Sequence, residues 1–341
     1  MRVLLTGGAG FIGQHLARAL TAGGHDVTAL DLLVPQVHAD AEAAVRTFPG
    51  EVVRGDVADP GAWAALARPD AVVHLAAETG TAQSMYEQER YRSVNVGGTT
   101  LAGEHAARWQ VPLVALSSRA VYGEGRYEDG APVASREDDP HHPVSVYGET
   151  KSQGEAALLP AAGRVPVTIV RPQNVVGPGQ ALHNPYTGVL AAFLAMLREG
   201  RPVTVYGDGS QTRDFVHVAD VAVLLTWLVD HPGDTGAPRV LNAGTGVRTS
   251  LLQLAHQAIA GRPDGVDAAV EVVHLDVHRA GDIEHACADL ARLRESGAPL
   301  PAWTTADAVA DFVRRSWDQP GARASAWDDA LEELADRGLT S

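Results

Sequence analysis

The stretch Val3–Leu20, VLLTGGAGFIGQHLARAL, is the clearest indication of the fold. An apolar run is followed by three spaced glycines, Gly7, Gly10 and Gly13, and by a helical pattern. Glycines in such a turn let the backbone approach a diphosphate closely, and the N-terminus of the following helix stabilises its negative charge. The stretch therefore predicts a strand, a turn and a helix that bind a dinucleotide.

Asp31 closes the next apolar run, about 20 residues after the glycine turn. A carboxylate there can bind the adenosine ribose hydroxyls and would repel a 2′-phosphate. No basic residue follows it in DLLVPQ, so NAD is predicted rather than NADP. Further cofactor contacts are expected in the turn and at the ends of two later strands, at Phe11, Ile12, Asp56, Val57, Leu75, Ala76 and Ala77.

Short apolar runs alternate with alanine-rich helical stretches over the first half of the chain. The runs lie at Val27–Leu30, Val52–Val53, Ala71–Leu75, Leu113–Leu116 and Val167–Val170. Runs of this kind are typical of strands that are buried on both faces of a parallel sheet. They predict an α/β fold with a doubly wound parallel sheet of the Rossmann type. Helices are expected after Phe11, Pro60, Ser84 and Ser145.

The alternation weakens after Pro172, which predicts a smaller C-terminal lobe. We expect the NAD-binding domain over residues 1–172, rejoined by about 214–247, and the lobe over 173–213 and 248–341. Within these parts, helical stretches are expected at Pro185–Gly200 and Asp214–His231, and a long loop at Gly123–Pro143. Near the C-terminus, Trp327, Leu331 and Leu334 form one apolar stripe on an acidic helix, for which packing is the expected role.

The composition excludes several classes of function. The 341 residues carry a net charge of -15, so the basic surface expected of a protein that binds nucleic acid or an anionic membrane is missing. The single cysteine, Cys287, cannot form an intramolecular disulfide, which fits a reducing cytoplasm. No signal peptide or membrane-spanning run is predicted. No grouping of histidine, cysteine and carboxylate residues has metal-site spacing, so no metal is expected.

Tyr147 and Lys151 lie at i and i+4, which places both on one face of a helix. A nearby ammonium and a positively charged nicotinamide would both favour the phenolate, so the pKa of Tyr147 is expected to fall toward working pH. Tyr147 could then act as a general base toward a substrate hydroxyl, and as a general acid in reverse. Lys151 is also expected to bind the nicotinamide ribose, and Ser118 to orient the substrate oxygen.

Together these motifs resemble the extended short-chain dehydrogenase/reductase superfamily, in its branch of NAD-dependent nucleotide-sugar epimerases and dehydratases. The resemblance covers nearly the whole chain. In that family the catalytic Ser or Thr lies four positions before the Tyr of a VYG segment, which selects Ser118 rather than Ser117 when counted back from Tyr122. Asn95, in YRSVNVGGT, matches the family's helix asparagine beside the cofactor.

The resemblance also implies a nucleotide-sugar site. Asn174 in RPQNVVGP corresponds to the family's asparagine at the diphosphate, and Tyr206 in VTVYGDGSQTRDFVHV to a residue that stacks on the base. Arg213 and Arg279 are expected to bind the phosphates, and Asp282 the nucleotide ribose or base. The resemblance also implies a homodimer that pairs helices around Ser93–Trp109 and Ser145–Leu159.

The residues after Ser118 narrow the reaction. Family members that dehydrate the sugar carry an Asp-Glu pair directly after the catalytic Thr, and decarboxylating members keep a Glu in this segment, whereas this chain has Arg119 and Ala120. What remains is transient oxidation at C4, rotation of the 4-keto sugar and re-reduction, which is the reaction of a 4-epimerase. Arg119 is expected to face the hexose or a phosphate.

Three stretches, AAETGTAQSMYE, SSRAVYGEG and NPYTGVL, resemble most the bacterial dTDP-L-rhamnose 4-epimerases, a subgroup of the family. Thr79 and Thr81 are expected to contact the sugar by their position after a strand end. The loop after Gly125 is shorter than expected for that subgroup. The segment VVGPGQALHN lacks an arginine for a uronic-acid carboxylate, which argues against UDP-glucuronate.

Several alternatives stay open. A 4-ketosugar reductase, or another nucleotide-sugar oxidoreductase or dehydratase, could use the same Ser118, Tyr147 and Lys151. A UDP-glucose 4-epimerase would share the chemistry. A non-catalytic regulator that senses NAD(H) is disfavoured, because such proteins tend to lose the Tyr/Lys pair.

Overall fold

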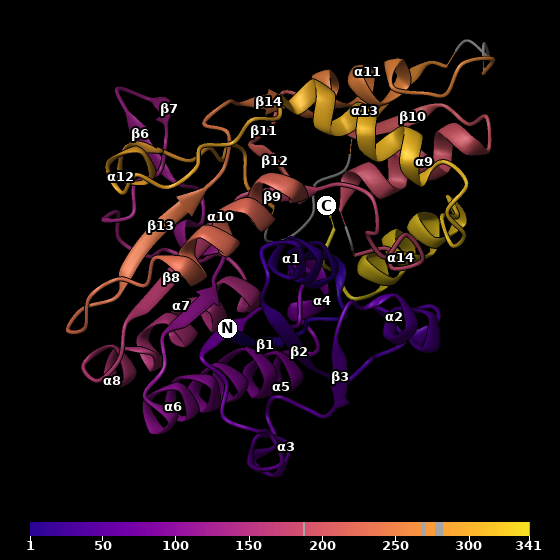
Figure 1. The fold of residues 1–341 in the computed structure, drawn as a ribbon. Coiled ribbons are helices and arrows are strands. Elements are labelled where there is room, and N and C mark those ends of the chain that lie inside the picture. The colour runs from indigo at the N-terminus through magenta and orange to yellow at the C-terminus, as the bar shows by residue number, and fades with distance from the viewer. Residues whose placement is uncertain (187, 267–269, 277–281, 341) are drawn as a thin grey trace.

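The computed structural model describes residues 1–186, 188–266, 270–276 and 282–340. Its centre is a seven-stranded parallel sheet in the order β13-β8-β5-β4-β1-β2-β3 (Figure 1). The strands are β1 Arg2–Thr6, β2 Asp26–Asp31, β3 Glu51–Arg54, β4 Ala71–His74, β5 Leu113–Leu116, β8 Val167–Pro172 and β13 Arg239–Ala243. The prediction of a doubly wound parallel sheet is thus confirmed.

Helices cover both faces of this sheet. On one face α1 (Phe11–Ala22) and α10 (Val218–Asp230) bury apolar side chains such as Leu16, Leu20 and Leu225 against the strands. The other face is covered by α3 (Pro60–Ala64), α6 (Thr99–Trp109) and α8 (Leu159–Ala162), next to α7 (Val146–Ala157). Shorter elements of this part are α2 Ala41–Thr47, α4 Thr81–Ser84, α5 Gln88–Tyr91, the π-helix Arg92–Gly98 and the 3-10 helix Arg119–Tyr122.

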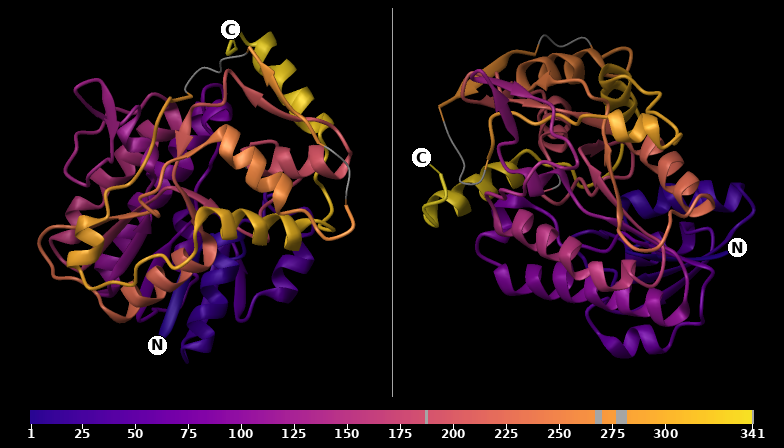
Figure 2. Two further views of the ribbon diagram at one scale, coloured as in Figure 1. Left: turned by 90° about the horizontal axis from the view of Figure 1, so that it is seen from above. Right: turned by 90° about the vertical axis from the view of Figure 1, so that its left-hand side faces the viewer.

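A smaller group of elements lies over the carboxyl ends of the strands. In the right-hand view of Figure 2 most of the orange and yellow elements lie above the purple ones. Its core is formed by apolar residues that include Phe193, Leu254 and Phe312. The helices are α9 Val189–Arg198, α11 Leu251–Ala260, α13 Thr305–Ser316 and α14 Ser325–Asp336, and α12 Ala291–Glu295 lies nearer the sheet. Three strand pairs complete it: β9 Asn174–Val176 with β12 Phe215–His217, β10 Val203–Tyr206 with β15 Val272–Leu275, and β11 Thr212–Arg213 with β14 Thr249–Ser250.

The structure corrects three of the expected elements. Asp214–His231 is not one helix, because Phe215–His217 pairs with β9 as a strand before α10 begins. The expected loop Gly123–Pro143 contains a hairpin of β6 (Arg126–Glu128) and β7 (Ala131–Val133). In place of one helix after Ser84, the chain forms α4, α5, the π-helix and then the longer α6. Each of these segments is too short or too polar for periodicity to reveal.

Within the described residues, no helix is both long and apolar enough to cross a membrane.

Candidate active site

A cavity of about 920 Å³ opens where β1, β2, β4 and β5 end, between the sheet and the second lobe. Ligands of open α/β sheets bind at such carboxyl ends. All the residues predicted above to bind cofactor or substrate line this cavity, except three. Asn95 and Lys151 lie behind its wall, and Arg279 lies outside the described residues.

The glycine turn leaves no room for side chains. Gly7 has a φ of +65°, and a Cβ there would lie 2.8 Å from the Cα of Ala76. A Cβ on Gly13 would lie 2.4 Å from the carbonyl oxygen of Gly8. Helix α1 begins directly after Gly10. No side chain caps the N–H groups of its first turn, and this turn holds no acidic residue. Its N–H groups are therefore available to a diphosphate, as a dinucleotide requires.

Asp31 lies at the end of β2 with only 8% of its surface exposed. Its carboxylate accepts N–H hydrogen bonds from Ala9 at 3.0 Å and from Leu33 at 2.9 Å. The imidazole Nε2 of His38 lies 3.4 Å from the same carboxylate and also borders the cavity. Sequence inspection missed His38, because it lies just beyond the segment searched for basic residues. These hydrogen bonds fix the Asp31 carboxylate at the cavity, where it suits the hydroxyls of the adenosine ribose of NAD.

The Asn95 side chain forms hydrogen bonds to two other segments of the protein. Its amide oxygen accepts the Glu78 N–H at 2.8 Å, and its amide nitrogen donates to the Glu78 carbonyl and the Thr150 hydroxyl, both at 3.0 Å. These bonds fasten the segment after β4 to helix α7. Asn95 therefore positions cavity-lining residues from behind, and its predicted place beside the cofactor stays a prediction.

The Ser118 and Tyr147 side chains meet at the cavity wall. The Tyr147 hydroxyl hydrogen-bonds with Ser118, which caps the 3-10 helix by accepting the Ala120 N–H at 3.1 Å. Ser145 caps α7, and the Tyr147 N–H donates to the Ser84 hydroxyl at 3.0 Å, so the start of this helix is fixed. The sequence correctly predicts that these two side chains come together, although they lie 29 positions apart.

Burial raises the pKa of Tyr147, opposed by its hydrogen bond with Ser118 and by the positive charge of Arg119. The pKa of Tyr147 is thus raised in the protein without cofactor. The fall expected from Lys151 together with a positively charged nicotinamide stays a prediction. The Lys151 ammonium donates to the Leu116 carbonyl at 3.0 Å, and burial lowers its pKa to about 8. Among the described residues, Arg119 is the cation that acts on the phenol.

Glu155 and Arg171 form a buried ion pair, and the Glu155 carboxylate acts on Lys151. Glu155, one turn further along α7, raises the pKa of Lys151. Its carboxylate accepts two bonds from the Arg171 guanidinium, at 2.9 and 2.7 Å, and one from the Ser117 hydroxyl. The Arg171 and Glu155 side chains are only 5% and 9% exposed. This carboxylate thus holds the end of β5, which carries Ser118.

Glu155→Gln is expected to lower the free energy of unfolding by about 3 kcal/mol, because it leaves a buried guanidinium without its counter-charge. The pKa of Lys151 should also fall, so the alkaline loss of kcat, as the ammonium deprotonates, should move to lower pH. Urea denaturation and a pH profile of kcat measure the two effects. Glu149→Gln, on the exposed side of the same helix, is the matched control. Equal stability of the two variants would contradict this role for Glu155.

Arg119 and Arg213 supply positive charge inside an acidic protein. Burial and the neighbouring Arg213 together lower the pKa of Arg119 to about 10, against the opposing effect of the Asp282 carboxylate. The Arg213 guanidinium donates to the carbonyls of Ile283 and Glu284 at 2.6 and 3.1 Å, which fixes its orientation at the cavity. A cavity with two arginines suits a diphosphate.

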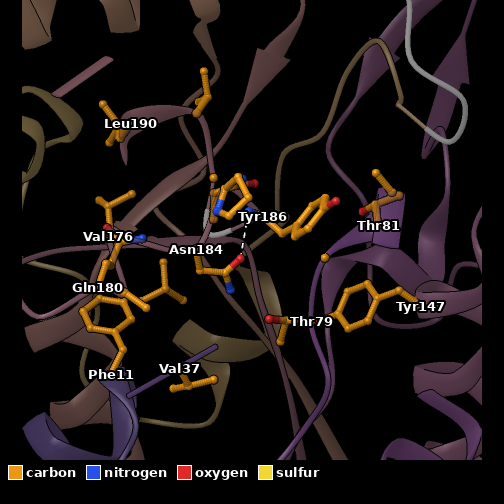
Figure 3. Close-up of a pocket in the computed structure, with 18 of the residues that line it drawn as sticks. Phe11, Val37, Thr79, Thr81, Tyr147, Val176, Gln180, Asn184, Tyr186 and Leu190 are labelled. Atoms are coloured by element: carbon orange, nitrogen blue, oxygen red, sulfur yellow. Dashed lines mark hydrogen bonds between the residues drawn. The ribbon is translucent and has the colours of Figure 1, made fainter. Parts of the chain in front are cut away.

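Sequence reasoning missed Asn184 and Tyr186, which line the cavity in the NPYTG segment. Figure 3 shows the Tyr186 ring between Asn184 and Thr81, on the side of the cavity that also carries Thr79 and Tyr147. The Asn184 side-chain oxygen accepts the Tyr186 N–H at 2.9 Å, which shapes this turn. The sole signal was the resemblance of NPYTGVL to a subgroup, and it named no contact residue.

In the part of the chain that the structure describes, no group of three or more His, Cys, Asp or Glu side chains could hold a metal ion.

Comparison with known proteins agrees with this site. Residues 3–244 match the model of the NAD dependent epimerase/dehydratase family. A dTDP-L-rhamnose 4-epimerase of Burkholderia thailandensis is 37% identical over 89% of this chain and 91% of its own. A UDP-glucose 4-epimerase of Mycolicibacterium smegmatis is 34% identical over 92% and 97%. The solved structure of MoeE5 in complex with UDP-glucuronic acid and NAD is 29% identical, with a TM-score of 0.76 over 93% of this chain and 98% of that one.

Proposed function

The chain belongs to the NAD dependent epimerase/dehydratase family, and we propose that it is a nucleotide-sugar 4-epimerase acting on dTDP-L-rhamnose or a related nucleotide hexose. One observation carries the choice of reaction. The Ser118–Tyr147 pair borders the cavity, but Arg119 and Ala120 follow Ser118 where a dehydratase would need an acid and a base. The Ser118–Tyr147 pair can exchange a proton with one hydroxyl of the sugar. Elimination of water would need an acidic and a basic carboxylate after Ser118, and Arg119 and Ala120 supply neither.

NAD is the cofactor, and when bound it supplies the hydride acceptor and donor for C4 of the sugar. The glycine turn and the start of α1 would hold its diphosphate, and Asp31 its adenosine ribose. Leu75, Ala76 and Ala77 border the same cavity at the end of β4. The tight glycine turn and the Asp31 carboxylate, which the Ala9 N–H holds in place, suit this group.

Tyr147 carries the proton in this account. Its phenolate takes the proton of the C4 hydroxyl, and the phenol returns that proton to the 4-keto oxygen after the sugar has turned over. Ser118 donates to the same oxygen, and Arg119 favours the charged form of Tyr147. Lys151 holds its place through the Leu116 carbonyl. Each cycle restores every protein group to its starting charge.

The nucleotide must stay bound while the sugar turns. Arg213, fixed by backbone carbonyls, and Asn174 are proposed to keep hold of the diphosphate, with Tyr206 and Asp282 on the nucleoside. The sugar would turn within the cavity of about 920 Å³, next to the bound cofactor.

We propose a 6-deoxyhexose as the sugar, chiefly because of the similarity to a dTDP-L-rhamnose 4-epimerase. Thr79, Thr81 and the Tyr186 ring offer short polar groups and an aromatic face at the sugar end. This agrees with the similarity to the dTDP-L-rhamnose 4-epimerase, which supports the same substrate here. A place in deoxysugar biosynthesis follows from that substrate.

We further propose a cytoplasmic homodimer. The two helices that would pair correspond here to α6, with the short helices before it, and to α7. Both lie on the face of the sheet away from α1 and α10 (Figure 1).

Incubation with dTDP-L-rhamnose, without added reductant, tests the proposed function. We expect NMR to show the C4 epimer, a 6-deoxy-L-talose nucleotide, while absorbance at 340 nm shows no accumulation of NADH. UDP-glucose and UDP-glucuronate are tested in separate incubations as alternative substrates. Steady NADH production, or conversion only when NADH and a 4-keto sugar are supplied, would instead assign a dehydrogenase or a reductase.

A further inference from the structure

Helix α14 borders the cavity, a position that its amphipathic pattern did not predict. Its Trp327, Asp328 and Leu331 line the cavity, while Ala330 and Leu334 are buried on the protein side. Figure 1 shows the helix in yellow between α9 of the second lobe and α2 of the first part. Two residues of the apolar stripe, Trp327 and Leu331, thus lie at the cavity as well as in the packing of the helix.

One end of α14 is fixed to the second lobe. Trp327 packs against the cluster that Ala192, Ala195 and Met196 of α9 form. Beside it, the Arg201 guanidinium donates twice to the Asp328 carboxylate, at 3.0 and 3.3 Å. Such a paired geometry restricts the orientation of the helix more than a single contact would.

The other end is fixed to the first part of the chain. The Tyr186 hydroxyl donates to the Glu333 carboxylate at 3.2 Å and hydrogen-bonds with the Tyr86 hydroxyl at 2.8 Å. The Arg337 guanidinium lies 4.0 Å from the centre of the Tyr86 ring, and it also donates to Glu333. Tyr86 follows α4, so α14 connects both sides of the cleft and touches the Tyr186 turn at the sugar end.

The neighbours of Trp327 indicate which part of the substrate it meets. Trp327 lies against α9, and both α9 and Thr204–Tyr206 of β10 line the cavity in the second lobe. This is the part of the cavity to which Tyr206 was assigned as a base-stacking residue. Trp327 and Leu331, at i and i+4, are both half-buried and present apolar surface to it. Aromatic surface of this kind suits a planar base.

We infer that α14 is a wall of the nucleotide-sugar site, and that Trp327 binds the nucleoside of the substrate. The inference rests on the proposed function, since it needs a nucleotide sugar in this cavity. In this inference α14 contributes to the affinity of the protein for the nucleotide. The chemistry at Tyr147, on the other side of the cavity, does not depend on it.

The test measures the affinity of the NAD-loaded protein for dTDP by isothermal titration calorimetry. Trp327→Ala is expected to weaken dTDP binding about tenfold, and to raise KM for dTDP-L-rhamnose equally without a change in kcat or in bound NAD. Glu332→Ala, on the exposed side of α14, should leave both values within about twofold of wild type. Because Trp327 also packs against α9, Leu331→Ala serves as a second variant with the same direction of effect.

Two results would overturn the inference. If the wild type binds dTDP and both variants bind it equally well, α14 is not part of the site and the proposed function still stands. If the wild type binds no dTDP under any condition, the proposed function fails and the inference fails with it.

Discussion

Tyr147→Phe should reduce kcat for epimerisation about a thousandfold, which is the typical loss when a general acid–base group is removed. The change deletes the hydroxyl that meets Ser118 and keeps the ring. The ring packs edge-on against Tyr91, at 6.4 Å between centroids, so the fold and the bound NAD should be retained. Stopped assays of product by NMR, with NAD content measured after denaturation, give both quantities.

Tyr127→Phe is the matched control for this change, because Tyr127 is 42% exposed on the β6–β7 hairpin and does not line the cavity. Its activity should equal that of the wild type. Activity of Tyr147→Phe within tenfold of wild type would mean that another group moves the proton, and the mechanism proposed here would be wrong.

Gly13→Ala should empty the protein of NAD and destabilise it. The added Cβ would lie 2.4 Å from the Gly8 carbonyl oxygen and 2.6 Å from the Gly8 carbonyl carbon. Both are backbone atoms of the turn, so only a shift of α1 away from the turn could relieve the clash. Overpacking of this kind costs on the order of 3 kcal/mol, and the shift would move the helix N-terminus away from the diphosphate.

Dialysis followed by measurement of bound NAD, together with a thermal melt, detects both effects of Gly13→Ala. Gly163→Ala is the control, because the nearest atom to its Cβ would be the Pro160 carbonyl oxygen at 3.7 Å, an ordinary contact. Retention of NAD at the wild-type level by Gly13→Ala would show that the turn does not hold the cofactor.

The sequence predicts best those features that consecutive residues encode. The stretch Val3–Leu20 contains a strand, its turn and its helix, and the structure has β1, the glycine turn and α1 there. Buried strands are also predicted well, since the strand expected at Leu113–Leu116 has the same bounds as β5. Tyr147 and Lys151 share a helix, so their spacing alone brings them together.

Contacts between distant segments were harder to predict. Tyr186, Glu333 and Tyr86 meet only because α14 crosses from the second lobe to the first part. Their residue types are ordinary, and no spacing links them. The burial that raises the pKa of Tyr147 was hard to predict for a related reason, since it depends on what the rest of the chain places around the phenol.

Transient oxidation at C4 is tested with dTDP-L-rhamnose that carries deuterium at C4, incubated in ordinary water without reductant. If the sugar is oxidised and re-reduced within one closed cavity, the deuterium returns to the carbon from which it came. We therefore expect the C4 epimer to retain the label at C4, with no deuterium in the solvent and no net NADH. An epimer that has exchanged its label for solvent hydrogen, or a labelled reduced cofactor that accumulates, would contradict the account.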